Sequence, residues 1–445
     1  MVKEISKYRF DIYTCAHPTL LPGIDLAWMA SDDEKVVAAV ILDLIDGDYG
    51  YVIFGRDKKK CFRRIDLPYE NGFFKDKKSA MEELKKKMKI YESDDNDIFP
   101  QGDEKGEPLE LFDLLVDPDK VHHVFKYVLE SEKHEATRRV IQELAYQFKS
   151  PDKQYAKEFQ LQFDSRLWEL FLYIVFRRSG FEISNKETYP DFMLKKAGIQ
   201  FAVEAVTVNP SQKEGVDVSF PDGLSQNLQD GYLPIKFGSS LTSKLNKKYW
   251  EKDHIKGKPF VIACHDYHQP GSMMFSDRTL LEYLYGIRLS FDENGQIVAN
   301  QIKEHVWNGK RIPSRFFYLP DAENISAVLL TNTATISKFN RMGKLGGFGG
   351  EGIKMYRQGW LRDPNPNATE GIPFCVDIDA LEYFESWRES ITMYHNPQAR
   401  YPVNWELFPR MTHLVWSEKD QTYQGLYEDH HVLSSCTGIY LKKNC

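Results

Sequence analysis

The stretch DSRLWELFLYIVFRRSGFEISNKETYPDFMLKKAGIQFAVEAVTVNP, residues 164–210, combines an apolar helix, carboxylates and a tight hairpin in one continuous segment. Its first part repeats apolar residues at helical spacing, namely Leu167, Leu170, Phe171, Ile174 and Val175. Asp164 and Ser165 are available as N-caps, and Gly180 is available as a stop. The sequence therefore predicts a buried helix that carries Glu169 on or beside its apolar stripe.

Two strands joined by a tight turn are expected next. Residues 191–194 and 199–208 are rich in apolar and β-branched residues, and Lys195-Lys-Ala-Gly198 separates them. With a turn of this length, opposite residues have numbers that sum to about 393, so Asp191 is expected across from Ala202 and diagonal to Glu204. Diagonal neighbours lie roughly 7–8 Å apart, close enough for two carboxylates to share a cation. Like charges so placed, beside Glu169, repel unless a metal ion or a proton lies among them.

This order of residues resembles the restriction-endonuclease-like, PD-(D/E)XK nuclease superfamily: a helix Glu, then Pro190-Asp191, then Glu204-Ala205-Val206. The resemblance covers about residues 164–265. It implies that Asp191 and Glu204 hold Mg²⁺ (or Mn²⁺), that the backbone carbonyl of Ala205 can join them, and that Glu169 completes the cluster. Asp191, Glu204 and Glu169 are thereby the expected catalytic residues.

The lysine of that superfamily is missing from its expected place. It should stand two residues after Glu204, where this chain has Val206. Lys186, Lys213 and Lys244 are candidates for a lysine that has migrated, and the sequence does not choose among them.

Glu204 also allows a plainer interpretation. It interrupts the otherwise apolar strand FAVEAVTV, and charged side chains are almost never fully buried unless they are paired or bound to a metal. The alternative is an edge strand on which Glu204 faces solvent or pairs with an arginine such as Arg177.

Composition limits the classes of protein that fit. A chain of 445 residues is longer than one hydrophobic core usually serves, so two or three domains are expected. Its 42% hydrophobic and 13% aromatic content is typical of a globular protein. The net charge of -7 restricts any contact with nucleic acid to a local basic groove. The six cysteines show neither a C-x-x-C pair nor zinc spacing, which favours reduced thiols. The chain shows no apolar signal core near its start and no stretch of about 18 apolar residues, so we expect a soluble, cytoplasmic protein without a membrane segment.

We expect an α/β (α+β multidomain) fold with three parts. In residues 1–108, the sequence pattern predicts an antiparallel β-meander followed by an amphipathic helix over residues 76–91. Residues 109–300 are expected to hold a helical lead-in and the nuclease-like core, a mixed sheet flanked by helices. Residues 301–445 are expected to form a C-terminal α+β region. Within that last part, the stretch 338–352 predicts a glycine-rich loop that could contact phosphate or be flexible.

A helix is predicted over 241–250, between the hairpin and a short buried strand over 258–264. Parallel neighbouring strands need such a crossover, as the nuclease core requires. The lysines of this helix, Lys244, Lys247 and Lys248, could meet a nucleic-acid backbone or form a solvated face. His265, Asp266 and His268 follow the strand directly. The two histidines could be ligands, although a structural turn is the favoured interpretation.

Two functions from different classes remain. The first is a Mg²⁺-dependent endonuclease, acting on DNA in defence or DNA processing, in which two copies could act as a dimer to cut both strands. The second is a nuclease-fold protein without cleavage that binds nucleic acid or a protein partner. An α/β-hydrolase is a weaker alternative, because the sequence contains no G-x-S-x-G.

Overall fold

The computed structural model describes residues 2–15, 23–68, 73–94, 96–148, 154–184, 189–209, 228–268, 272–365 and 368–441. Their fold is mixed α/β, as the sequence predicted. The cysteines within these ranges, Cys15, Cys61, Cys264, Cys375 and Cys436, are free thiols. No helix within these ranges is both long and apolar enough to cross a membrane.

The N-terminal part is the predicted meander. Its five strands are hydrogen-bonded in chain order, and every pair is antiparallel: β1 Val2–Glu4, β2 Gly23–Ser31, β3 Val36–Asp43, β4 Tyr49–Arg56 and β5 Phe62–Asp66. Helix α1 spans Lys7–Thr14, and helix α2, Lys77–Ser93, is capped by Asp76. Side chains of β3 alternate between two cores, so Val36 and Ala38 pack under α2 while Val37 and Ala39 face the central helices.

The centre of the molecule is helical. The central helices are α3 His123–Glu130, α4 Glu135–Gln147, α5 Tyr155–Leu161 and α6 Phe163–Arg178. Helix α6 is buried at every position from Leu170 to Phe176, which is the signature of a helix enclosed on all sides. It begins at Phe163, two residues before the start that an Asp164 cap would give, because α5 leads into it through Gln162, and it ends before Gly180.

An eight-stranded mixed sheet lies against α6. Its order is β19-β18-β17-β14-β9-β8-β7-β6. The strands are β6 Glu182–Ser184, β7 Phe192–Lys196, β8 Ile199–Val208, β9 Phe260–Asp266, β14 Ala327–Leu330, β17 Thr392–His395, β18 Thr412–Ser417 and β19 Thr422–Leu426. The pairs β8·β9 and β9·β14 are parallel, with α7, Leu233–Leu245, as the crossover between β8 and β9. This sheet takes strands from both sides of residue 300, so the expected boundary there does not separate two sheets.

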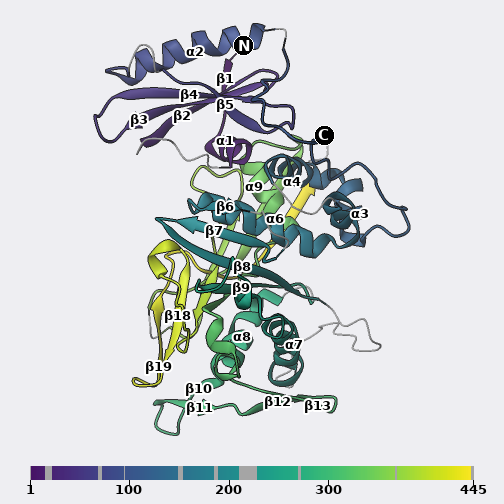
Figure 1. The fold of residues 1–445 in the computed structure, drawn as a ribbon, viewed down its shortest axis with the longest axis vertical. Helices are drawn as coiled ribbons and strands as arrows, with labels where there is room; N and C mark the ends of the chain where they lie inside the picture. Colours follow the sequence, from purple (N-terminus) through teal and green to yellow (C-terminus); the bar gives the residue numbers. More distant parts are fainter. Residues whose placement is uncertain are drawn as a thin grey trace.

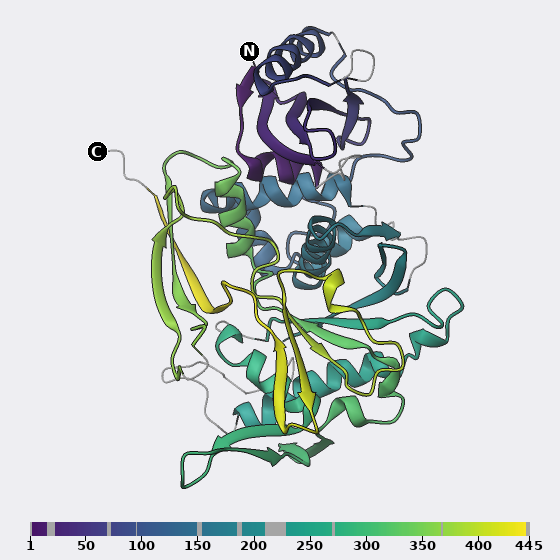
Figure 2. The same ribbon diagram turned by 90° about the vertical axis from the view of Figure 1, so that its left-hand side faces the viewer.

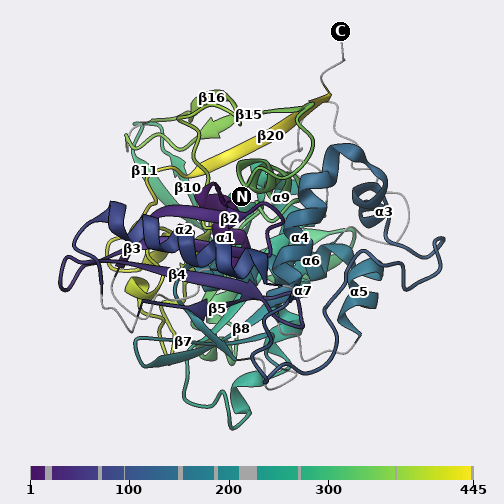
Figure 3. The same cartoon turned by 90° about the horizontal axis from the view of Figure 1, so that it is seen from above.

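Figure 1 shows these elements as layers: α2, the small sheet, the central helices, the large sheet, and then α7 with α8, Ser276–Tyr285. Two hairpins lie beyond α7 and α8: β10 Ile287–Phe291 with β11 Ile297–Gln301, and β12 Glu304–Trp307 with β13 Lys310–Pro313. The view in Figure 2 shows a separate three-stranded sheet on one flank, made of β15 Ile353–Leu361, β16 Ile372–Asp377 and β20 Val432–Leu441. Seen from above, α9, Ile336–Leu345, lies beside that sheet (Figure 3).

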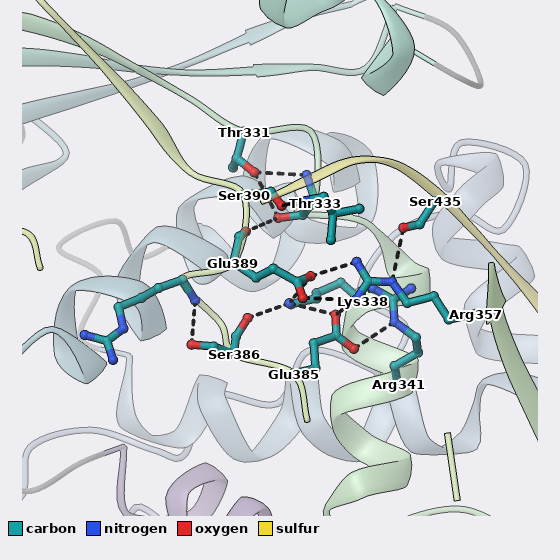
Figure 4. A network of polar contacts seen from close by, with 12 residues as sticks. Thr331, Thr333, Lys338, Arg341, Arg357, Glu385, Ser386, Glu389, Ser390 and Ser435 are labelled. Atoms are coloured by element: carbon teal, nitrogen blue, oxygen red, sulfur yellow. Dashed lines mark hydrogen bonds and ion pairs between the residues drawn. The ribbon is translucent and has the colours of Figure 1, made fainter. Parts of the chain in front are cut away.

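The predicted glycine-rich loop over 338–352 is wrong for its first half. Thr335 caps α9, and the helix continues to Leu345 because Phe339 and Met342 enter the central core. Lys338 and Arg341 are consequently buried in an ion network and do not face solvent. Figure 4 shows both side chains converging on Glu385, with Nζ of Lys338 and Nη2 of Arg341 each 2.7 Å from Oε1.

The ion network around Glu385 also connects the three-stranded sheet to the core. Arg357 of β15 donates to both oxygens of Glu389, and its Nη1 lies 3.5 Å from Glu385. Burial alone would raise the pKa of Glu385, but Arg341, Lys338 and Arg357 hold it well below its usual value. Glu385 therefore stays ionised in the core and links three cations.

Replacing Glu385 with Gln should lower the free energy of unfolding by on the order of 3–5 kcal/mol, because it leaves buried cations without their counter-charge. Urea unfolding followed by circular dichroism measures the change. Glu293→Gln, at an exposed position in the β10–β11 hairpin, is the control and should shift stability by less than about 0.5 kcal/mol. Similar stability of the two variants would contradict this assignment.

Candidate active site

Glu204 lies in the middle of β8, between β7 and β9, with 1% of its surface exposed. The edge-strand interpretation is therefore wrong. Its partner is not Arg177: Nζ of Lys244 lies 2.6 Å from Oε1 of Glu204. The second oxygen, Oε2, is buried and has no hydrogen-bond partner among the residues that the structure describes. A carboxylate so enclosed still has lone pairs for another ligand.

Asp191 immediately precedes β7, and its Oδ2 accepts a 2.7 Å hydrogen bond from the backbone N–H of Ala205. The expected register is wrong by two residues. Phe192 pairs with Val203 and Lys196 with Ile199, so the same register places Asp191 opposite Glu204 and not Ala202. The two acidic residues are thus closer neighbours than the diagonal arrangement predicted.

The cause of the register shift is the turn. Ala197 and Gly198 both have positive φ, 50° and 79°, as in the two-residue turns that match the twist of a hairpin. Strand β7 therefore continues through Lys196, and the turn is two residues long instead of four.

The electrostatic state of Asp191 reflects crowding by like charges. Burial, together with the carboxylates of Glu204 and Glu169, raises its pKa to about 8, against smaller lowering effects of the Ala205 N–H and Lys244. Asp191 is therefore protonated near neutral pH when no cation is bound. A divalent cation between the carboxylates would replace that proton.

Glu169 reaches this site from α6 but is already paired. Nη1 of Arg166 donates to both of its oxygens at 2.9 Å, and Arg166 also pairs with Glu158. Across the described ranges, no three His, Cys, Asp or Glu side chains are grouped so that they could hold a metal ion. The structure therefore does not bring Glu169 together with Asp191 and Glu204 as a third ligand.

The residues nonetheless fit Mg²⁺. This ion prefers oxygen ligands, keeps several waters, and is commonly held by one or two carboxylates together with substrate phosphates. Asp191 and Glu204 supply two carboxylates, and Oε2 of Glu204 is without a partner in the described part. A role for the carbonyl of Ala205 stays a prediction.

Lys244 is the lysine that the structure places at the carboxylate pair. It lies on α7, whose Leu241 and Leu245 are buried against the sheet. Lys186 and Lys213, the other candidates, lie outside the described residues.

The predicted helix over 241–250 is displaced, because α7 begins at Leu233 and ends at Leu245. The chain then turns at Lys248, where φ is 48°, into the 3₁₀ turn Tyr249–Glu251. Lys248 pairs with Asp321 at 2.7 Å, and Lys247 lies 5.6 Å from the centre of the Tyr249 ring. Of the three lysines proposed for nucleic-acid contact, only Lys244 reaches Glu204.

Sequence reasoning missed an aromatic pair beside the carboxylates. The rings of Tyr189 and Tyr249 are stacked, with centroids 5.6 Å apart and planes 15° apart. Burial and the charge of Glu204 raise the pKa of Tyr249, while Tyr189 is 47% exposed. No signal in the sequence could have paired them, since Tyr249 is positioned by the turn after α7.

Comparisons with known proteins do not assign this chain to a family. No family model matches the chain, and searches of curated proteins and of solved structures found no significant match.

Proposed function

We propose that this chain is a Mg²⁺-dependent nuclease that hydrolyses phosphodiester bonds, with DNA as the leading substrate. The observation that carries the proposal is the position of Lys244. The strand has Val206 where the superfamily has its lysine. Helix α7 supplies Lys244 instead, and its ammonium lies 2.6 Å from Glu204. Two carboxylates and a lysine thus meet at one buried place, which is the donor set of the superfamily that the sequence resembles.

The order of elements supports the same reading. Helix α6 precedes the antiparallel strands β6, β7 and β8, and α7 then crosses over to the parallel strand β9. We place the protein in the cytoplasm, where its free thiols would stay reduced, and expect that two copies could act together on a duplex.

Each residue has a distinct part in the proposed reaction. Asp191 and Glu204 would hold the ion, which when bound lowers the pKa of a water and stabilises charge on the phosphate. Lys244 would orient the attacking water or stabilise the negative charge that develops on the phosphate. Arg166 holds Glu169 as an ion pair, and the charge of Glu169 would help to keep the pKa of Asp191 high without adding a further ligand. Tyr189, being half-exposed, offers a face on which a base can stack.

A second function is favoured by the same ion pair. Lys244 compensates Glu204 without any metal, and Asp191 can remain neutral by keeping its proton. The site could then be a stable remnant in a nuclease-fold protein that binds nucleic acid or a protein partner.

Purified protein incubated with single- and double-stranded DNA and RNA tests the proposal. We expect cutting with Mg²⁺ or Mn²⁺, none with a chelator, and none by Asp191→Ala or Glu204→Ala. Glu182→Ala is the matched control, because Glu182 is an exposed carboxylate in β6 of the same sheet and should cut normally. Binding without cutting by the wild type would favour the second function, and absence of both would contradict both.

A further inference from the structure

A crevice opens where β9 and β14 end. These strands are parallel neighbours, but the helices that follow them lie on opposite faces of the sheet. Helix α8 packs with α7 and places Leu280 and Leu284 in the core on one face, whereas α9 packs with α4, and its Phe339 ring contacts Phe171 of α6 on the other face. In open α/β sheets, ligands bind outside the carboxyl ends of the strands.

A cavity of about 1020 Å³ lies at this point. His265 and Asp266 of β9 line it, as do Asn332 and Thr333, which follow β14. Its lining also includes residues of the three-stranded sheet, among them Trp360 and Phe374. Mixed apolar and polar walls of this volume suit a ligand of drug or nucleotide size.

One end of the cavity is formed by the N-terminus of α9. Thr335 and Ser337, in the capping position and first turn of the ten-residue helix α9, line it. The unpaired N–H groups and dipole at a helix N-terminus attract anions, and phosphate groups above all. Arg341, one turn further along, lines the same end and is held in place by Glu385 and Thr437.

His265 gives an independent sign of a ligand. Burial lowers its pKa to about 3, so the ring is neutral. Its Nε2 accepts the backbone N–H of Ala334 at 3.1 Å, which leaves the proton on Nδ1. This Nδ1 is buried and has no partner among the described residues, although His265 is only 1% exposed and forms part of the cavity wall. A buried donor without an acceptor is costly unless a ligand or water receives it.

His268 adds a second unpaired atom in the same wall. Its Nδ1 lies 2.5 Å from Oδ1 of Asp266, and Ser276 also donates to Asp266. The ring is thereby fixed, and its Nε2 has no partner within the described ranges. Two histidines, each with a buried ring nitrogen that has no partner in the part of the chain that the structure describes, therefore line one cavity.

We propose that this cavity binds a nucleoside phosphate, separately from the carboxylate pair of the proposed nuclease. The phosphate would lie at the N-terminus of α9, and the base would stack on Trp360 or Phe374. Asp164, on the α6 side of the cavity, is an acceptor for a ribose hydroxyl. This inference does not depend on nuclease activity.

Titration calorimetry in chelator-containing buffer tests the proposal, with ADP, GDP, CDP and UDP as probes and a short 5′-phosphorylated single strand as a second source of the same chemistry. Ser337→Glu should weaken binding at least about tenfold by repelling phosphate, yet leave Tm unchanged or raised, since a negative charge stabilises this helix end. Ser337→Gln is its neutral control.

Trp360→Ala should weaken binding by about tenfold through lost stacking. Tyr356→Ala is the matched control, because Tyr356 lies on the same strand, is similarly exposed (41% against 45%), and does not line the cavity. The proposal is supported if a nucleoside diphosphate or the 5′-phosphorylated strand binds, and if both test variants weaken that binding while both control variants retain it. Absence of binding by every probe, or affinity that none of the variants changes, would overturn it.

Discussion

Lys244→Met should reduce the rate of nucleic-acid cleavage by on the order of 10²–10³-fold, the usual effect of removing one group that stabilises transition-state charge. Methionine keeps the apolar stem of the side chain along α7 but removes the ammonium that lies 2.6 Å from Glu204. If this lysine replaces the one missing at Val206, metal binding should survive while turnover falls. Single-turnover cleavage with saturating Mg²⁺ separates these two effects.

The same substitution has a structural cost that must be measured separately. It leaves Glu204 buried without its counter-charge, which costs on the order of 3–5 kcal/mol. Cleavage should therefore be assayed well below the Tm of the variant, with Lys248→Met as control. Lys248 is an exposed lysine just beyond α7 that pairs with Asp321, and its loss should leave the rate within about twofold. A folded Lys244→Met protein with the wild-type rate would refute the role given to this lysine.

Local patterns in the sequence predicted the elements that carry the site. Helix α6 was predicted because its apolar residues repeat at helical spacing, and the hairpin because its strands are apolar on both sides of a turn. The register failed because it depends on the backbone at Ala197 and Gly198, whose positive φ values shorten the turn. That shift moved Asp191 from opposite Ala202 to opposite Glu204.

What depends on packing between distant segments could not be predicted. Lys244 is 40 residues beyond Glu204, and only the orientation of α7 on the sheet selects it. Arg341 looked like a loop cation because glycines follow it, whereas the buried face of α9 and a partner at Glu385 determine its place. The boundary expected at residue 300 does not separate two sheets, because β14 pairs with β9, and no local pattern reports that pairing.

Mg²⁺ should stabilise this protein much more at about pH 8 than at about pH 6. Burial, together with Glu204 and Glu169, raises the pKa of Asp191 to about 8, from 3.8 for the ordinary carboxyl. Between these values the folded chain holds a proton that the unfolded chain has released. This contribution to stability is full below about pH 4 and is lost as pH rises through about 8.

The proton and the cation compete for Asp191. A carboxylate must be ionised to bind Mg²⁺, so affinity should rise by up to about tenfold per pH unit until about pH 8. The shift in Tm on adding Mg²⁺ should grow accordingly, because stabilisation follows the ratio of ion concentration to Kd. Thermal unfolding across this pH range, with and without Mg²⁺, measures both trends.

Asp191→Asn separates this group from the other titrating residues. Asparagine is neutral at every pH and keeps an oxygen that can accept the N–H of Ala205, so the fold should persist. The difference between wild type and variant then reports Asp191 alone: without metal, the wild type should lose stability relative to the variant as pH rises toward about 8. With Mg²⁺ that loss should vanish, because the ion replaces the proton between Asp191 and Glu204. A difference that is flat with pH in both conditions would mean that Asp191 is already ionised in the folded chain, and the carboxylate pair would then need no cation to compensate it.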